Sequence, residues 1–188
     1  MPTPSRCLLP MLLSWSAASV AATITVDSTA DTYAADGVCT LREALNAANL
    51  NAMVNGDCAA GTPAPAVDVI AFAIPGTGPH VIRPATYLGQ INESLRIDGT
   101  TQAGAVPNSA TPQQGGLNGI IAIEISGEDC NNCGVPIGLA VTSGEFTLRG
   151  LAISHYASAL SQAVATNATF RVEGCHVGVA ADGINTGG

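Results

Sequence analysis

The residues best suited to chemistry are two carboxylates and an arginine at equivalent places in a repeated segment. Asp98 and Glu173 each precede a glycine, and so does Arg149 in a segment between them. A polysaccharide lyase needs acidic calcium ligands and a basic residue, and a glycosidase needs two carboxylates at a suitable separation. If the segments stack in sequence order, Asp98 and Glu173 lie three rungs apart, roughly 14 Å by strand spacing. Arg149 then pairs with Glu173, and we expect no catalytic residue here.

A second candidate is the pair Cys130 and Cys133, in the loop sequence Cys-Asn-Asn-Cys. It could be a small disulfide-closed loop, half of a zinc site, or a redox motif of the thioredoxin type. A zinc site needs four ligands, and the sequence has no second Cys-x-x-Cys. A redox motif belongs between a strand and a helix, whereas this loop is rich in Gly and Asn. We favour the disulfide.

Calcium is the one ion that the acidic residues suggest. Asp27, Asp31 and Asp36 recur near the start of the chain, but their spacing is not that of an EF-hand. We expect solvated, turn-forming aspartates. The three histidines are scattered and have no metal-ligand spacing. We therefore expect no cofactor or metal site, with calcium kept as an alternative.

The N-terminus has the features of a secretory signal peptide. Arg6 supplies the positive charge, Leu8–Trp15 the apolar run, and Ser19–Ala22 the cleavage site. The apolar run is too short to span a bilayer, and no later run reaches the roughly 18 residues needed. We expect an exported protein without a transmembrane span, located outside the cell, at the cell surface or in the periplasm.

Export makes disulfides the expected state of the cysteines. A bond between Cys39 and Cys58 would close a loop around a predicted helix. Cys175 is then left over. It either lacks a partner or is a free buried thiol.

Four segments share the pattern apolar, polar, apolar, polar, glycine. They are Leu95–Gly99, Ile123–Gly127, Phe146–Gly150 and Phe170–Gly174. The terminal glycines, Gly99, Gly127, Gly150 and Gly174, recur at intervals of 28, 23 and 24 residues. The alternation predicts half-buried strands that end in turns. A period of this length predicts coils stacked in parallel, as in a solenoid.

Stacking these segments in sequence order predicts a register. The inward columns are Leu95, Ile123, Phe146, Phe170 and Ile97, Ile125, Leu148, Val172. On the outside, Arg96 would neighbour Glu124, and Arg149 would neighbour Glu173, so that opposite charges meet. Thr101–Asn118 is long and poor in apolar residues, and we expect it to be an excursion loop from one coil.

The sequence Cys39-Thr40-Leu41-Arg42-Glu43-Ala44 predicts a helix start. Thr40 can cap the first turn, and the Glu43 carboxylate can reach back to the Thr40 amide. Apolar residues then recur at helical spacing. A short helix of this kind, tied by a cysteine, would cover the exposed end of a stack of strands.

The same six residues resemble the CSLREA motif of secreted bacterial β-helix proteins, with Thr40 in place of serine. Leu95–Gln102 and Leu148–Ile153 are also similar to that family. The resemblance implies an exported, all-β protein with a right-handed parallel β-helix and a short N-terminal capping helix. It implies little about activity, because such domains occur in large surface proteins whose roles are mostly unassigned.

We therefore expect a signal peptide over residues 1–22, a cap over 23–66, and coils over 67–188 that are incomplete at the C-terminal end. The predicted function is an adhesin-like scaffold for structural or adhesive display, without catalysis. The alternative is the N-terminal part of a pectate-lyase-like, polysaccharide-active enzyme. A third possibility, a calcium-stabilised interaction module, rests on the acidic balance alone.

The partners expected from the charge balance are few. The chain has 14 Asp and Glu against 6 Lys and Arg, which argues against nucleic acid and anionic membranes. A surface glycan, a protein, or the rest of a longer chain are the partners that the sequence allows.

Overall fold

The computed structural model describes residues 20–114, 118–130, 137–162 and 168–184. Most of the regular structure in this part is parallel sheet, with one α-helix near its start. Residues 1–19, which carry most of the predicted signal peptide, and Cys133 lie outside the described residues.

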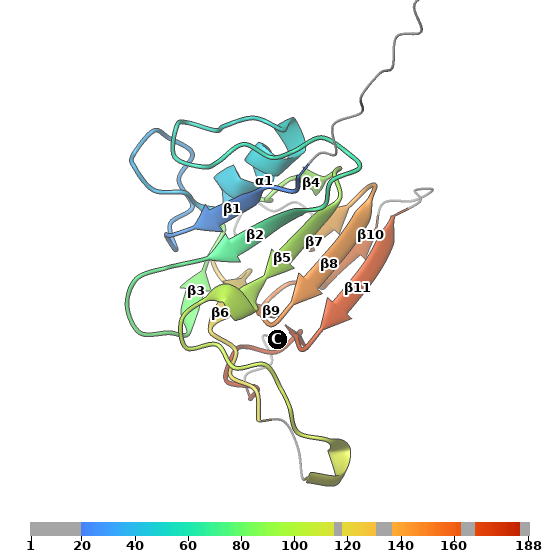
Figure 1. Cartoon of the computed structure of the whole chain (residues 1–188). Helices are drawn as coiled ribbons and strands as arrows, with labels where there is room; N and C mark the ends of the chain where they lie inside the picture. Colours follow the sequence, from blue (N-terminus) through green and yellow to red (C-terminus); the bar gives the residue numbers. More distant parts are fainter. Residues whose placement is uncertain (1–19, 115–117, 131–136, 163–167, 185–188) are drawn as a thin grey trace, which may run out of the picture.

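The strands form three parallel sheets (Figure 1). The five-stranded sheet has the order β1 (Thr23–Val26), β2 (Asp68–Phe72), β5 (Leu95–Asp98), β8 (Glu145–Arg149), β11 (Thr169–Glu173). The four-stranded sheet has the order β12 (His176–Val177), β9 (Ala152–Ser154), β6 (Ile123–Ser126), β3 (His80–Ile82). The three-stranded sheet has the order β10 (Ser158–Gln162), β7 (Ile137–Val141), β4 (Gln90–Ile91).

After β1 and the helix, the chain visits these sheets in a fixed order. It passes from the five-stranded to the four-stranded and then to the three-stranded sheet as β2–β3–β4, β5–β6–β7 and β8–β9–β10. It then returns to the first two sheets as β11 and β12. From β2 onward, the chain therefore pairs each strand with a strand one round earlier or later, and β1 pairs with β2.

The predicted register is wrong for the segment Ile123–Ser126. This segment is β6, which belongs to the four-stranded sheet, so β5 pairs directly with β8. Arg96 lies opposite Thr147 and not next to Glu124. The physical reason is that alternation looks the same in every half-buried strand and does not say to which sheet a strand belongs.

The remaining members of the predicted columns are in register. Leu95 pairs with Phe146, which pairs with Phe170, and the two phenylalanine rings meet edge to face at 5.7 Å between centroids. Arg149 lies opposite Glu173, as predicted. Ile123 is also buried, but within the four-stranded sheet.

The four predicted turn glycines are needed for two different reasons. Gly150 and Gly174 have φ of +62° and +58°, which side chains rarely adopt. Gly99 and Gly127 instead lie against backbone, where an added Cβ would be 2.5 Å from the Gly150 carbonyl oxygen and 2.3 Å from that of His155. Both kinds of position therefore disfavour larger residues, by backbone strain at Gly150 and Gly174 and by close contact at Gly99 and Gly127.

The predicted excursion loop leaves the sheets after the short 3-10 helix Gly99–Thr101 (Figure 1). Val106 and Ile120 pair across it in an antiparallel bridge, and a second 3-10 turn, Pro112–Gln114, lies between them. The loop accounts for the long interval between β5 and β6.

Candidate functional site

The helix α1 (Leu41–Leu50) begins with the capping box that the sequence predicts. The Thr40 hydroxyl oxygen accepts a hydrogen bond from the Glu43 amide at 3.3 Å. The Glu43 carboxylate accepts one from the Thr40 amide at 3.1 Å. Two amides that lack partners inside the helix are satisfied in this way.

Glu43 does more than cap the helix. Its side chain is fully buried, and its Oε1 also accepts hydrogen bonds from the Ala34 amide at 3.0 Å and from Asn55 Nδ2 at 2.7 Å. A buried carboxylate is tolerated when donors surround it. Glu43 thus ties the loops on both sides of α1 to the helix start.

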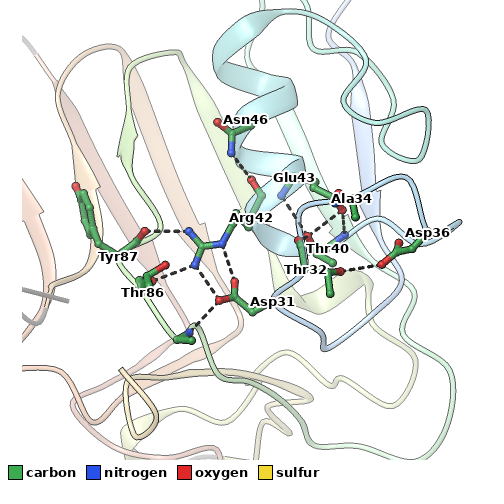
Figure 2. Close-up of polar contacts among 11 residues, drawn as sticks. Asp31, Thr32, Ala34, Asp36, Thr40, Arg42, Glu43, Asn46, Thr86 and Tyr87 are labelled. Atoms are coloured by element: carbon green, nitrogen blue, oxygen red, sulfur yellow. Dashed lines mark hydrogen bonds and ion pairs between the residues drawn. The ribbon is translucent and has the colours of Figure 1, made fainter. Parts of the chain in front are cut away.

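Arg42 connects α1 to two other segments (Figure 2). Its Nε and Nη2 donate to the two carboxylate oxygens of Asp31 at 2.8 and 2.9 Å, in the two-pronged geometry that arginine favours. Nη1 and Nη2 also donate to the carbonyls of Tyr87 and Thr86 at 2.9 and 3.0 Å. Asp31 in turn accepts from the Ala85 amide.

The interpretation of Asp31 as a solvated turn residue is therefore wrong. Both side chains of the Arg42–Asp31 pair are only 15% exposed. Sequence reasoning missed this contact because Asp31 and Arg42 lie on separate elements. The presence of an arginine in the helix's first turn, where acidic residues are favoured, was the available signal.

The disulfide Cys39–Cys58 is present, as predicted, with a Cα–Cα distance of 4.9 Å. Both cysteines are buried. The bond closes a loop that contains α1 and lies next to the Thr40 cap. Cys130 is also disulfide-bonded.

Helix α1 packs against β1 and β2 and reaches the edge of the three-stranded sheet (Figure 1). Asn49 Nδ2 donates to the Gln90 carbonyl of β4 at 2.7 Å, and its Oδ1 accepts from the Asn92 amide at 3.0 Å. The side-chain amide thus occupies the donor and acceptor that a further strand would use. Helix α1 thus covers the β4 edge of the three-stranded sheet.

Tyr156 lies at the turn between β9 and β10, with its ring beside Gly127 and Gly138. Burial raises the pKa of its phenol to about 12. The Asp31 carboxylate raises this pKa further, and Arg42 opposes it.

A pocket of about 430 Å³ lies between the excursion loop and the ends of β8 and β11. Its walls combine Val106 and Ile120 of the loop with Arg149, Glu173 and His176 of the sheets. Two of the three charged residues that the sequence singled out, Arg149 and Glu173, therefore line the same pocket.

Asp98, Arg149 and Glu173 occupy three successive strands, β5, β8 and β11. Asp98 and Glu173 are thus two rungs apart, roughly 10 Å by strand spacing, not three. Arg149 Nη1 lies 3.6 Å from Asp98 Oδ2, whereas Glu173 pairs with Arg171 on its own strand. The expected Arg149–Glu173 ion pair is replaced by these two pairs.

Cys175 is the free thiol that the sequence left open, and it lines the same pocket. Burial raises the pKa of this thiol, which lowers its reactivity at neutral pH. Its Sγ donates to the Glu173 carbonyl at 3.3 Å.

A second polar cluster, which sequence reasoning missed, lies on the four-stranded sheet. Glu124 accepts hydrogen bonds from the Ser154 hydroxyl at 2.5 Å and from the Ala181 amide at 2.9 Å. His155 Nδ1 lies 2.9 Å from Ser154 Oγ and 3.2 Å from Ser126 Oγ. Because Glu124 was assigned to the wrong sheet, its buried position was not expected. The cluster holds the segment around Ala181 against the sheet.

The other two N-terminal aspartates also serve backbone structure. Asp27 accepts a hydrogen bond from the Cys39 amide at 2.8 Å, and Asp36 accepts one from the Val38 amide at 3.3 Å. Within the described residues, no group of three or more His, Cys, Asp or Glu is placed to hold a metal ion.

No protein-family model, curated protein or solved structure matches this chain. No helix in the described part of the chain combines the length and the apolar character needed to cross a membrane.

Proposed function

We propose that the chain is an exported parallel β-helix scaffold that displays its outer surface and does not catalyse a reaction. The observation that carries this proposal is the repeated passage through three parallel sheets in the same order. Each sheet is one face of the solenoid, and each passage is one coil. Crossovers between parallel strands favour a right-handed path.

In this proposal α1 is the cap of the first coil. An open stack of parallel strands exposes unpaired backbone groups that promote association. Asn49 and the Arg42–Asp31 pair place α1 across that end, and the disulfide keeps it there. The segment that resembles the CSLREA motif thus covers exposed strand edges, and each of its polar residues has a partner that holds the segment in place.

The pocket beside β8 and β11 supports display more than catalysis. Its charged residues pair with opposite charges, Arg149 with Asp98 and Glu173 with Arg171. A general base or nucleophile needs a group free to exchange a proton with a substrate. Because both charged side chains already pair with opposite charges, this lining suits a binding surface for a neutral glycan or a protein.

The alternative, a polysaccharide-active enzyme, is favoured by one observation. Asp98, Arg149 and Glu173 lie on adjacent strands, and Arg149, Glu173 and His176 line one pocket. Two carboxylates and an arginine are therefore closer together than the sequence predicted.

The two functions differ in their products. The purified full chain should be incubated with pectin and alginate, with and without calcium, and the products analysed for new reducing ends and unsaturated sugars. We expect neither. Products that disappear in Arg149→Ala, but persist in Arg83→Ala, would establish the enzyme. The control is matched because the two arginine side chains are 43% and 44% exposed. A calcium-dependent rise in thermal stability without products would favour the calcium-stabilised module.

Export is tested separately by fractionation of cells that express the full chain. The proposal expects a product shortened near Thr23 outside the cytoplasm. A full-length chain that stays in the cytoplasm would contradict it.

A further inference from the structure

A carboxylate is buried at the point where β1 and β2 begin. Asp68, the first residue of β2, is only 1% exposed. Its Oδ1 accepts a hydrogen bond from the Ala22 amide at 2.8 Å, and its Oδ2 accepts one from the Thr62 amide at 2.7 Å. Within the described residues, no arginine or histidine forms an ion pair with this carboxylate. A cation in place of one neutral donor would strengthen its hydrogen bond.

The segment before Thr62 encloses the carboxylate on one side. A Cβ added at Gly61 would lie 2.8 Å from Asp68 Oδ2 and 2.9 Å from the carbonyl oxygen of Ala47 in α1. The Gly61 amide also donates a hydrogen bond to that carbonyl at 3.3 Å. This close packing leaves no room for a cationic side chain on the side of α1, whereas Ala22 already donates from the start of β1.

Ala22 is the residue at which the described chain begins to be held by the sheet. Its carbonyl accepts a hydrogen bond from the Val69 amide at 2.9 Å, while its amide donates to the buried carboxylate. Ala21 is exposed, and Val20 is 84% exposed. A chain that began at Thr23 would lose both hydrogen bonds of Ala22. A chain that began at Ala22 would keep them.

The residues before Ala22 also fit cleavage at this point. The cleavage site of a signal peptide has small residues at the first and third positions before the cut. For a cut between Ala21 and Ala22 these residues are Ala21 and Ser19. A cut one bond later would place the larger Val20 at the third position.

We propose that a signal peptidase hydrolyses the bond between Ala21 and Ala22, and that the new α-ammonium group of Ala22 forms an ion pair with the buried carboxylate of Asp68. Water supplies the oxygen of the new Ala21 carboxylate, and both of its protons end on the Ala22 nitrogen. That nitrogen already lies 2.8 Å from Asp68 Oδ1. The cut is one residue before the boundary expected from the sequence, and the inference rests on the proposed export.

The ion pair exists only once the leader has been removed. In the precursor the Ala22 nitrogen is a neutral amide, and in the mature chain it is a cation. The mature chain thus gains a charge-assisted hydrogen bond between the start of β1 and the start of β2. Folding is therefore more favourable after export than before it.

The first test is the N-terminus of the exported product. Cells that express the full chain are fractionated, and the product outside the cytoplasm is analysed by intact mass and N-terminal sequencing. We expect Ala22 as the first residue. A product that begins at Val20 or Thr23 would overturn this inference and leave export intact, whereas an uncut chain in the cytoplasm would contradict both.

The second test measures the ion pair through the reactivity of the α-amine. Because the sequence has no lysine, this group is the only primary amine of the mature chain, and an amine-selective acetylating reagent should modify it alone. A neighbouring carboxylate favours the protonated amine, which the reagent does not attack. We expect the native chain to react about tenfold or more slowly than the same chain in urea. Equal rates would overturn the ion pair.

Two variants separate the ion pair from simple burial of the amine. Asp68→Asn keeps an acceptor for the Ala22 nitrogen without the charge and should restore most of the fast reaction. Asp27→Asn is the control, because Asp27 also accepts a backbone amide at 2.8 Å but follows the other end of β1. It should react as slowly as the parent chain. A folded Asp68→Asn chain that also reacts slowly would overturn the ion pair.

A stability measurement covers the case in which Asp68→Asn does not fold. The parent chain is acetylated in urea and refolded, which removes the charge of the amine and leaves every side chain in place. We expect the acetylated chain to unfold at a lower temperature than the unmodified chain. An unchanged midpoint of thermal unfolding would overturn the ion pair.

Discussion

The strands at the two ends of the sheet stack are similar, but they differ in how far other elements cover them. At the first end, α1 covers β1 and β2, and a disulfide, a capping box and an ion pair hold it in place. At the other end, β11 and β12 carry half-exposed valines where earlier strands have buried residues. Alternating apolar and polar residues give a strand one face that can be buried. The element that packs on that face decides how much apolar surface is removed from water, and therefore how much stability the burial contributes.

Replacing each phenylalanine of one inward column by alanine should show this difference most strongly. Phe146 is fully buried between β5 and β11, and Phe146→Ala should lower the free energy of unfolding by about 3–5 kcal/mol. Phe170, on the edge strand, is partly buried, and Phe170→Ala should cost less than half as much. Denaturant unfolding at low protein concentration measures both. Equal losses would show that the last round is as well covered as the others.

The disulfide at the first end gives the next largest effect. Cross-linking two cysteines separated by 19 residues restricts the unfolded chain and contributes about 3 kcal/mol in the loop-entropy description. Cys39→Ser combined with Cys58→Ser should lower the free energy of unfolding by that amount. Cys175→Ser, which removes only a free thiol, is the control. A double variant as stable as the control would mean that α1 is held by its other contacts alone.

The helix cap contributes less. Thr40→Ala removes the acceptor for the Glu43 amide and should cost about 0.5–2 kcal/mol. Thr40→Ser keeps the hydroxyl and should be close to the parent chain. Thermal unfolding compares the two variants. A serine variant as unstable as the alanine variant would assign the loss to the missing methyl group instead of the cap.

Tyr156 provides the smallest effect, which appears only in alkali. Burial raises the pKa of its phenol from the ordinary value of 10.0 to about 12 in the folded chain. The folded state therefore holds the proton longer than the unfolded state, and this contribution to stability is present below pH 10 and is lost as the pH rises toward 12. Ultraviolet titration of tyrosinate should lose its latest step in Tyr156→Phe. An unchanged titration would contradict the burial of this phenol.

The sequence predicted local structure well and the assignment of strands to sheets poorly. The cap at Thr40 and the bond from Cys39 to Cys58 follow from short spacings, because capping and loop closure involve residues close in sequence. The inward positions of Leu95 and Phe146 follow from alternation. Glu124 was misplaced because its strand has the same pattern as strands of the five-stranded sheet.

The candidate sites show the same limit. Arg149 and Glu173 were correctly placed on neighbouring strands, but their ion-pair partners were predicted wrongly. Because β6 belongs to another sheet, β5 pairs directly with β8, and Asp98 therefore lies next to Arg149. The Arg42–Asp31 pair and the Glu124–Ser154 contact join segments whose packing no local pattern encodes. Such contacts become predictable only when the sheet assignment is known.

The assignment of β5 and β6 to different sheets is tested most directly by engineered disulfides in a Cys175→Ser background. Arg96 and Thr147 are paired residues of neighbouring strands, where Cα atoms are close enough for a disulfide. Arg96→Cys with Thr147→Cys should therefore cross-link on mild oxidation, as peptide mapping would show. Arg96→Cys with Glu124→Cys should stay reduced, because these positions lie in different sheets. Cross-linking of the second pair and not the first would restore the sequence-order stack and contradict the three-sheet path.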